Sequence, residues 1–445
     1  MEPGRSFLNK QLERLECHFT WNLDNSPTKL DQLWEHLEEK IQEECSWLGH
    51  LYNLLGYVHH ARGYTKEALS YLKRAEGMIR EQGPTELYSR LLVNQTNLAW
   101  VHYCRGELTE SQTYLEKVQK LQQASPPPPE CNLHPEVSGE KGWTLVKFGK
   151  SYRHRAIECF EMALKGEPER KEWHKGLAIA MSGAYLKSEI TPELQTKILE
   201  QIKKARDKNP DCLYMVSLYL VKLPLCQSSV PEAIVKEALS LVDRMSINWE
   251  GLSNILEFLR RKVSLDSALD VAQRALKKFP QSSGVKKQVA ICYKWKIFSI
   301  KENSTKKQNL ISKAVDFYEE VIGSYPHYLR GKLDLATMYS LSGNEQRADQ
   351  IYSDLFLKTD SLEPRALQLL YSRYGSHLNW LKRSSDESID YHKKAAEIPA
   401  LSEDRENSIR ILNSIVQRGQ HHKCEEIRNF LENLRAHEDN KLTSQ

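Results

Sequence analysis

The 445-residue sequence has no run of eighteen apolar residues, and its first nineteen residues, MEPGRSFLNKQLERLECHF, lack the apolar core of a signal peptide. A membrane span and secretion are therefore not expected, and we expect the protein in the cytosol. The nine cysteines are odd in number, scattered and never spaced as CxxC. This spacing indicates reduced thiols and neither a disulfide framework nor a zinc site.

Catalytic motifs are also missing. The sequence has no GxxxxGK[ST] phosphate loop, no GxGxxG, no GxSxG and no HExxH. Cys17 and His18 are adjacent on an expected helix, where neighbouring side chains point about 100° apart, so they cannot act together as nucleophile and base. The histidine pairs at 59–60 and 421–422 would need further ligands to bind a metal. We expect no enzyme activity, no cofactor and no metal site.

What the sequence does contain is a repeated pair of helices. The tetratricopeptide pattern asks for a large and then a small residue on the first helix, and for small, large and small residues on the second. The small residues let antiparallel helices approach closely, and the large ones fill the remaining space. Three stretches follow this spacing without a gap: Leu55, Gly56, Gly63, Ala68, Leu72 and Ala75; Leu98, Ala99, Gly106, Ser111, Leu115 and Val118; and Leu335, Ala336, Tyr339, Gly343, Ala348, Tyr352 and Leu355.

Partial matches continue the same frame along the chain. They are Trp143, Ala156, Phe160, Ala163 and Pro168; Ile202, Ala205 and Pro210; Ala268, Ala272, Ala275 and Pro280; and Ala314, Tyr318, Val321 and Pro326. A degenerate unit at 375–395 brings the number to about eight. We predict an all-α fold, a tetratricopeptide-repeat solenoid (helix-turn-helix superhelix) of about eight repeats, in preference to a generic helical bundle.

Two stretches interrupt this array. Residues 125–136 begin with Ser-Pro-Pro-Pro-Pro, which predicts a stiff linker or, alternatively, a PxxP motif for a partner. Residues 301–310 contain the polar string KENSTKK and predict a surface loop. The predicted parts are the N-terminal helices with the first two repeats (1–124), the linker (125–136), the central repeats with a basic channel (137–300), the loop (301–310), the C-terminal repeats (311–400), and the C-terminal helices and tail (401–445).

Positive charge is concentrated in one segment. From Arg260 to Lys313, fourteen lysines and arginines stand against three acidic residues, which gives +11, so the rest of the chain sums to −7 against the overall +4. Positive charges at this density on successive helices repel one another. This favours a polyanionic partner, nucleic acid above all.

A shorter stretch, residues 141–155, has five basic residues and no acidic one. Trp143, Phe148 and Tyr152 are interleaved with these basic residues, a pattern that suits single-stranded RNA or DNA because phosphates pair with the charges and bases stack on the rings. Lys147 occupies a repeat position that tends to line the concave side of such superhelices. The alternative interpretation is a solvated helix face.

Several segments resemble the interferon-induced proteins with tetratricopeptide repeats. The string LERLECHFTWNL (12–23) is similar to the opening of that family, and YNLLGYV (52–58), NLAWV (97–101), EKGW (140–143), GLAIA (176–180) and FLRRK (258–262) follow in family order. The resemblance covers the chain to about Tyr352. It implies a cytosolic antiviral effector of innate immunity that binds RNA in a basic channel, often at uncapped or incompletely capped 5′ ends, and that assembles with itself and with other members.

The resemblance also implies roles for single residues. The implied phosphate or RNA contacts are Lys147, Tyr152, Arg260 and Gln288, with Lys287 beside the glutamine. Lys150 and Lys286 are added as candidates because they are positively charged. Further candidates are His36, Lys40, Arg261 and Lys294.

Three positions depart from the family pattern. Gly183 stands where many members have an arginine, and Ser253 and Asn254 replace an arginine and an aromatic residue. Each absent guanidinium would form paired charge-assisted hydrogen bonds with phosphate, each worth roughly 1.5–3 kcal/mol. We therefore expect RNA binding with a relaxed or different end preference. The alternative is a scaffold of the same family whose groove holds protein partners.

Overall fold

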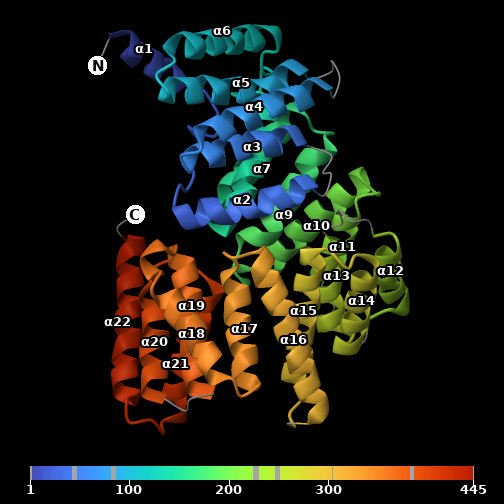
Figure 1. Cartoon of the computed structure of the whole chain (residues 1–445), viewed down its shortest axis with the longest axis vertical. Helices are drawn as coiled ribbons and strands as arrows, with labels where there is room; N and C mark the ends of the chain where they lie inside the picture. The colour runs from blue at the N-terminus through green and yellow to red at the C-terminus, as the bar shows by residue number, and fades with distance from the viewer. Residues whose placement is uncertain are drawn as a thin grey trace. The chain divides into compact units, whose positions relative to one another are not determined.

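The computed structural model describes residues 3–42, 48–81, 87–223, 230–245, 251–302, 304–380 and 385–443. Within these ranges the chain forms twenty-two α-helices and four short 3-10 or π turns, with no strand (Figure 1). No helix among them is long and apolar enough to cross a membrane. The chain divides into two compact units, unit 1 (residues 1–185 and 189–271) and unit 2 (186–188 and 272–445).

Unit 1 is a succession of helix pairs. Its elements are α1 (Pro3–Leu12), α2 (Pro27–Gln42), α3 (Leu48–Ala61), α4 (Thr65–Glu81), α5 (Leu87–Cys104), α6 (Leu108–Ala124), α7 (Pro135–Phe148), η1 (Lys150–Tyr152), α8 (Arg153–Gly166), α9 (Lys171–Ala184), α10 (Pro192–Lys208), α11 (Leu213–Lys222), α12 (Glu232–Asp243), α13 (Leu252–Phe258), η3 (Leu259–Val263) and the first half of α14 (Leu265–Lys278).

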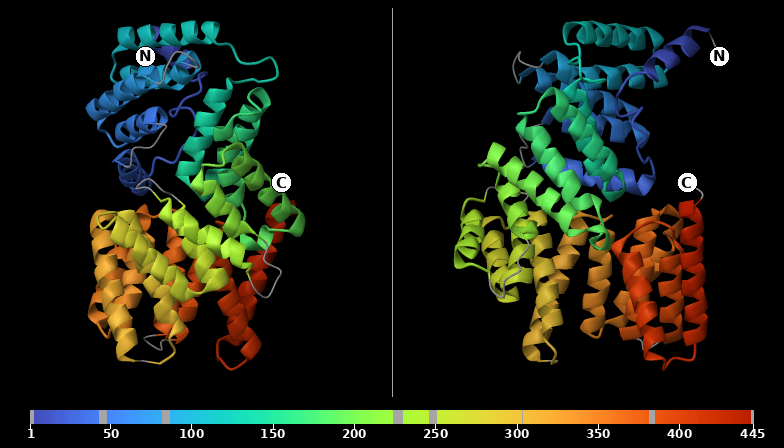
Figure 2. Two further views of the ribbon diagram at one scale, coloured as in Figure 1. Left: turned by 90° about the vertical axis from the view of Figure 1, so that its right-hand side faces the viewer. Right: turned by 180° about the vertical axis from the view of Figure 1, so that it is seen from behind.

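Unit 2 continues the same arrangement, and Figure 2 shows its last helices packed side by side. Its elements are η2 (Lys187–Glu189, up to residue 188), the second half of α14, α15 (Ser283–Ser299), α16 (Thr305–Ser324), α17 (Leu329–Leu341), α18 (Glu345–Phe356), η4 (Thr359–Ser361), α19 (Pro364–Trp380), α20 (Ser385–Glu397), α21 (Glu403–Arg418) and α22 (Cys424–Thr443).

The repeat residues lie where the pattern requires them. Ala68, Leu72 and Ala75 of α4 are fully buried, and a Cβ atom at Gly56 of α3 would lie 2.5 Å from Cγ of Leu72. Only glycine therefore permits this crossing without a shift. Gly63 joins the two helices with φ +89°, a left-handed conformation that favours glycine. The prediction of an all-α tetratricopeptide-repeat solenoid is confirmed.

One helix pair among the described residues, α11 with α12, escaped the sequence pattern. Helix α11 has ten residues, and its fully buried small residue is Ser217 instead of Gly or Ala. The serine is tolerated because its hydroxyl donates to the carbonyl oxygen of Tyr214. Short helices with a polar small residue carry too little of the pattern to be recognised.

Both predicted interruptions are shorter than expected. Helix α7 already begins at Pro135, where the His134 side chain accepts a hydrogen bond from the Glu136 backbone N–H. Helix α16 begins at Thr305, inside the predicted loop, because the Ser304 hydroxyl caps it by accepting from the Lys307 backbone N–H.

The segment that follows α1 is irregular, which corrects the expected helix around Cys17 and His18. Cys17 and His18 in this segment are buried, and Nδ1 of His18 lies 3.0 Å from the Asn97 amide nitrogen while its Nε2 lies 3.2 Å from the Thr144 hydroxyl. Burial lowers the pKa of His18 to about 3 and raises the pKa of Cys17 to about 12. The segment fastens α5 to α7, and neither side chain is poised as a base or a nucleophile.

Candidate nucleic-acid interface

The bend between α7 and α8 carries two of the predicted RNA contacts. Helix α7 ends at Phe148 because Gly149 adopts φ 111°, so Lys147 lies in its last turn and Lys150 opens η1. The Lys29 ammonium, from α2, lies 3.4 Å from the place that a Cβ atom of residue 149 would take. Three lysines are therefore associated with one turn of the chain.

Two further cations lie at the end of α9. Nη1 of Arg153 donates to the carbonyl oxygen of Ile179 at 2.5 Å, and Nζ of Lys222 donates to that of Ser182 at 2.9 Å. Burial lowers the pKa of both side chains. Neither Arg153 nor Lys222 forms an ion pair with any residue that the structure describes.

Electrostatic repulsion connects this pair with its neighbours. After burial, the pKa of Lys222 is raised by the charge of Glu257 and lowered by those of Arg261, Arg153 and Lys150. Arg261 forms an ion pair with Glu257 at 2.7 Å. We call Lys150, Arg153, Lys222 and Arg261 the α9 cation cluster. All four side chains carry positive charge, and a concentration of positive charge attracts anions.

For the other candidate residues of unit 1, the structure gives the exposure and the helix on which each lies. Arg260 is partly exposed in the π-helical turn η3, a feature that is frequent at functional sites. His36 is partly buried on α2. Lys40 belongs to α2 but lies outside the residues whose side chains are described. Of the replaced positions, Ser253 is exposed, whereas the Asn254 amide donates to the Ser217 hydroxyl at 3.1 Å and serves helix packing.

The structure corrects the interpretation of the aromatic side chains in 141–155. Phe148 is buried in the core with α2 and α3, and the Trp143 ring packs edge-on against Phe160 at 5.4 Å. The Tyr152 ring packs against Phe148 at 5.7 Å. The large residues of the repeat pattern fill helix crossings, so Phe148 is not available to stack on bases.

Two basic residues of the same stretch hold the N-terminal segment. Lys141 forms an ion pair with Glu16 at 2.8 Å, and Nη2 of Arg155 donates to the carbonyl oxygen of Trp21 at 2.5 Å. Arg153, in contrast, donates to the carbonyl oxygen of Ile179 on α9.

In unit 2, three predicted contacts interact with the protein's own side chains. Lys286 forms an ion pair with Glu320 at 2.6 Å, and the Lys287 ammonium lies 4.2 Å from the centre of the Tyr328 ring. Lys294 is only 8 % exposed and pairs with the buried Asp334 at 2.6 Å. We therefore withdraw Lys294 as an RNA contact. Gln288 is half-buried on the same helix, α15.

The basic segment from Arg260 to Lys313 crosses the boundary of the two units. Eight of its fourteen basic residues are exposed: Arg261, Lys262, Arg274, Lys277, Lys278, Lys301, Lys306 and Lys313. The remaining ones are partly or fully buried. The charge count of the sequence thus combines solvated and internally paired cations.

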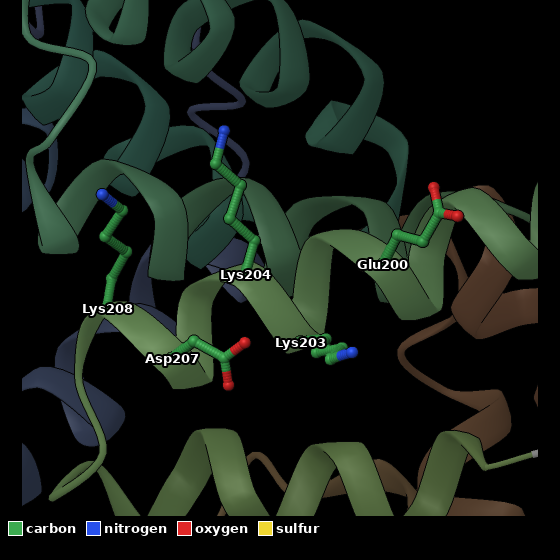
Figure 3. Close-up of a pocket in the computed structure, with 5 residues that line it drawn as sticks. All are labelled: Glu200, Lys203, Lys204, Asp207 and Lys208. Atoms are coloured by element: carbon green, nitrogen blue, oxygen red, sulfur yellow. The ribbon is translucent and has the colours of Figure 1, made fainter.

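A hollow beside α10 is lined by charged residues of both signs, Glu200, Lys203, Lys204, Asp207 and Lys208 (Figure 3). Lys208 forms an ion pair with Glu169 of the α8–α9 connection. The mixed charge distinguishes this hollow from the α9 cation cluster and makes it a poor site for a polyanion.

His421 and His422 acquire a partner in Asp386, whose two carboxylate oxygens lie 3.3 and 3.4 Å from their Nε2 atoms. Nδ1 of His421 accepts a hydrogen bond from the Lys423 backbone N–H. In the neutral ring Nε2 then carries the proton. Hydrogen bonding and charge pairing thus account for this exposed cluster.

Lys222 was not predicted as a site residue from the sequence, and Arg153 was included only as one of the basic residues of 141–155. The available signal for Lys222 was a lysine at the end of the otherwise apolar helix LYMVSLYLVK. Their proximity depends on the packing of α8, α9 and α11, which no local pattern reveals.

No family model matches the chain. The human antiviral innate immune response effector IFIT1 is 31 % identical over 422 residues, which are 92 % of this chain and 87 % of that protein. The chain belongs to the family of interferon-induced proteins with tetratricopeptide repeats. The Macaca fascicularis IFIT1 is 32 % identical over 91 % of this chain and 86 % of its own length, and the human interferon-induced protein with tetratricopeptide repeats 2 is 28 % identical over the same shares.

Solved structures of the family share the fold. The human IFIT1 dimer with PPP-AAAA has a TM-score of 0.71 at 29 % identity and covers 97 % of this chain and 96 % of its own. A monomeric IFIT1 mutant with Gppp-AAAA has a TM-score of 0.72 at 27 % identity, covering 96 % of this chain and 100 % of its own. The resemblance first noted in the sequence is thereby confirmed.

Proposed function

We propose that this family member is a cytosolic, non-enzymatic antiviral effector that binds single-stranded RNA, including its 5′-phosphorylated end, through unit 1. Lys147, Lys150, Arg260 and the α9 cation cluster form the proposed contact surface. The proposal includes assembly with family members, since IFIT1 has been solved as a dimer with a triphosphate oligonucleotide.

One observation carries the proposal, namely that Arg153 and Lys222 donate to carbonyl oxygens three residues apart on α9, and that neither forms an ion pair with a described residue. Bringing like charges together out of water costs free energy. A protein that retains such an arrangement gains when an anion binds there. The cations of α15, in contrast, have acidic or aromatic partners within unit 2.

The test is the salt dependence of binding to a short unstructured RNA. Four phosphate contacts to a single strand predict a slope of about −2.8 in log affinity against log salt, or a roughly fiftyfold loss between 50 and 200 mM salt. A flat response, together with no RNA recovered by cross-linking in cells, would reject RNA binding and favour the protein scaffold.

A further inference from the structure

The helix pair α15–α16 is longer than the pair α17–α18 that follows it in unit 2. Helix α15 has 17 residues and α16 has 20, whereas α17 has 13 and α18 has 12. The two pairs can be aligned by their fully buried alanines, Ala290 with Ala336 and Ala314 with Ala348. In this alignment, residues 296–299 of α15 and 305–310 of α16 extend past the ends of α17 and α18 (Figure 1). We call residues 295–302 and 304–310 the hairpin tip.

The hairpin tip exposes two large aromatic side chains. Trp295 is 45 % exposed and Phe298 is 51 % exposed. They are three residues apart on α15 and therefore lie on the same face of that helix. Ile300 and Leu310, which are half-buried, add apolar residues to the same tip. Single exposed apolar side chains are common on soluble proteins, whereas apolar side chains gathered at one place indicate an interaction surface.

The charge of the hairpin tip is positive. Its described residues include four lysines and one acidic residue, a net charge of +3: Lys296, Lys301, Lys306, Lys307 and Glu302. Lys301 and Lys306 are exposed. Nζ of Lys307 donates to the carbonyl oxygen of Ile300 at 2.8 Å, which holds its charge at the end of α15. The tip therefore combines exposed aromatic rings with cations.

This combination on a projecting hairpin fits a flat anionic surface. Peptides are usually held in grooves or at sheet edges, and single-stranded nucleic acid is usually held in a positively charged groove where bases stack on rings. A projecting tip instead reaches a surface with its end. Tryptophan favours the boundary between lipid headgroups and acyl chains, and lysines beside an anionic membrane each add about fivefold to the affinity.

We propose that the hairpin tip docks on anionic lipid membranes. Trp295 and Phe298 insert among the lipid headgroups, and Lys301 and Lys306 contact the lipid anions. Lipid docking is a second binding activity of the protein, in unit 2, and it does not rest on the RNA binding proposed for unit 1.

The experiment measures co-sedimentation of the full-length protein with vesicles of phosphatidylcholine alone or with about 30 % phosphatidylserine. Wild type should bind the phosphatidylserine vesicles at least about tenfold more tightly than the neutral ones. The double variant Trp295→Ala with Phe298→Ala should lower the affinity for phosphatidylserine vesicles about tenfold or more, because apolar side chains no longer leave water on docking. The matched control is Leu357→Ala with Trp380→Ala, since both residues are exposed in unit 2 outside the tip. We expect this control to stay within twofold of wild type.

The lysines are tested in the same assay. Lys301→Gln with Lys306→Gln should lower the affinity for phosphatidylserine vesicles roughly tenfold or more, whereas Lys358→Gln, at an exposed lysine outside the tip, should stay within twofold. Because all of these side chains are exposed, the melting temperatures should stay at the wild-type value.

No binding of wild type to phosphatidylserine vesicles would overturn the proposal. So would equal binding of wild type and the aromatic double variant, because the attraction would then be a general effect of net charge. Tip variants that lose RNA affinity and keep vesicle affinity would assign the tip to RNA and also overturn lipid docking. Failure of wild type to bind RNA would overturn the proposed function and leave lipid docking standing.

Discussion

One buried carboxyl of unit 1 and one of unit 2 have different partners. In unit 1, the buried Glu140 accepts a hydrogen bond from the Asn53 amide at 2.9 Å and forms no ion pair with a described residue. In unit 2, the buried Lys294 and Asp334 pair directly at 2.6 Å, and the Tyr318 hydroxyl also donates to Asp334. The buried carboxylate of Asp334 is thus neutralised by an ammonium, whereas that of Glu140 has only a hydrogen bond.

The comparison shows that the net charge of a sequence segment does not locate a binding site. The +11 segment includes Lys286 and Lys294, which the fold neutralises. The decisive Lys222 lies outside that segment. Whether a cation has an ion-pair partner among the described residues is a property of tertiary structure, and the proposed function rests on it for Arg153 and Lys222.

The largest effect should come from breaking the internal pair of unit 2. Lys294→Met leaves Asp334 buried without its ammonium, which should destabilise unit 2 by about 3–5 kcal/mol. Urea denaturation measures the loss, and the double variant Lys294→Met with Asp334→Leu should recover most of it. Equal stability of Lys294→Met and wild type would show that the pair does not hold unit 2 together.

The buried carboxyl of Glu140 in unit 1 predicts that the free energy of unfolding depends on pH. Burial raises the pKa of Glu140 to about 8, above its value in the unfolded chain, so folding retains a proton and stability is lost as pH rises from about 4.5 to 8. Glu140→Gln keeps the acceptor for Asn53 without the titration. Its free energy of unfolding relative to wild type should rise across that window, by a few kcal/mol as an order of magnitude.

The nearby Glu136 keeps its partners Arg90 and Arg170 in both proteins. A stability difference that is constant from pH 5 to 9 would contradict the assignment of a neutral Glu140.

Overpacking tests whether the two units are separable. Ala163 of α8 is fully buried in the core with Trp173. Ala163→Trp should cost roughly 1–3 kcal/mol, and hydrogen exchange should show the loss first in α7, α8 and α9, because solenoid stability is a sum of neighbour terms. Simultaneous and equal loss of protection in unit 2 would contradict that separation.

A smaller effect is expected from reversing one charge at the proposed interface. Lys147→Glu should lower RNA affinity about tenfold or more with little change in melting temperature, since it replaces attraction of phosphate by repulsion. Lys306→Glu, on the exposed first turn of α16, is the control and should cost less than half as much binding free energy. Equal effects would mean that the basic residues act as a diffuse surface.

Local patterns predicted most of the fold because helix crossings use residues close in sequence, as Gly56 and Leu72 do. They predicted less of the site. Asp334 lies 40 residues beyond Lys294, and Arg153 meets Ile179 across a helix pair. Aromatic residues were misread for a related reason, since Phe148 serves the core and the sequence does not tell an RNA-stacking ring from a packing one.

The most direct test of the central claim compares the salt slopes of RNA binding for wild type, Lys222→Gln and Lys286→Gln. Lys222 has no ion-pair partner among the described residues, whereas Lys286 pairs with Glu320. Removing one phosphate contact to a single strand should reduce the slope by about 0.7. We predict that reduction for Lys222→Gln and an unchanged slope for Lys286→Gln. The reverse order, or equal slopes in both variants, would contradict the claim that RNA binds where the fold leaves cations without acids.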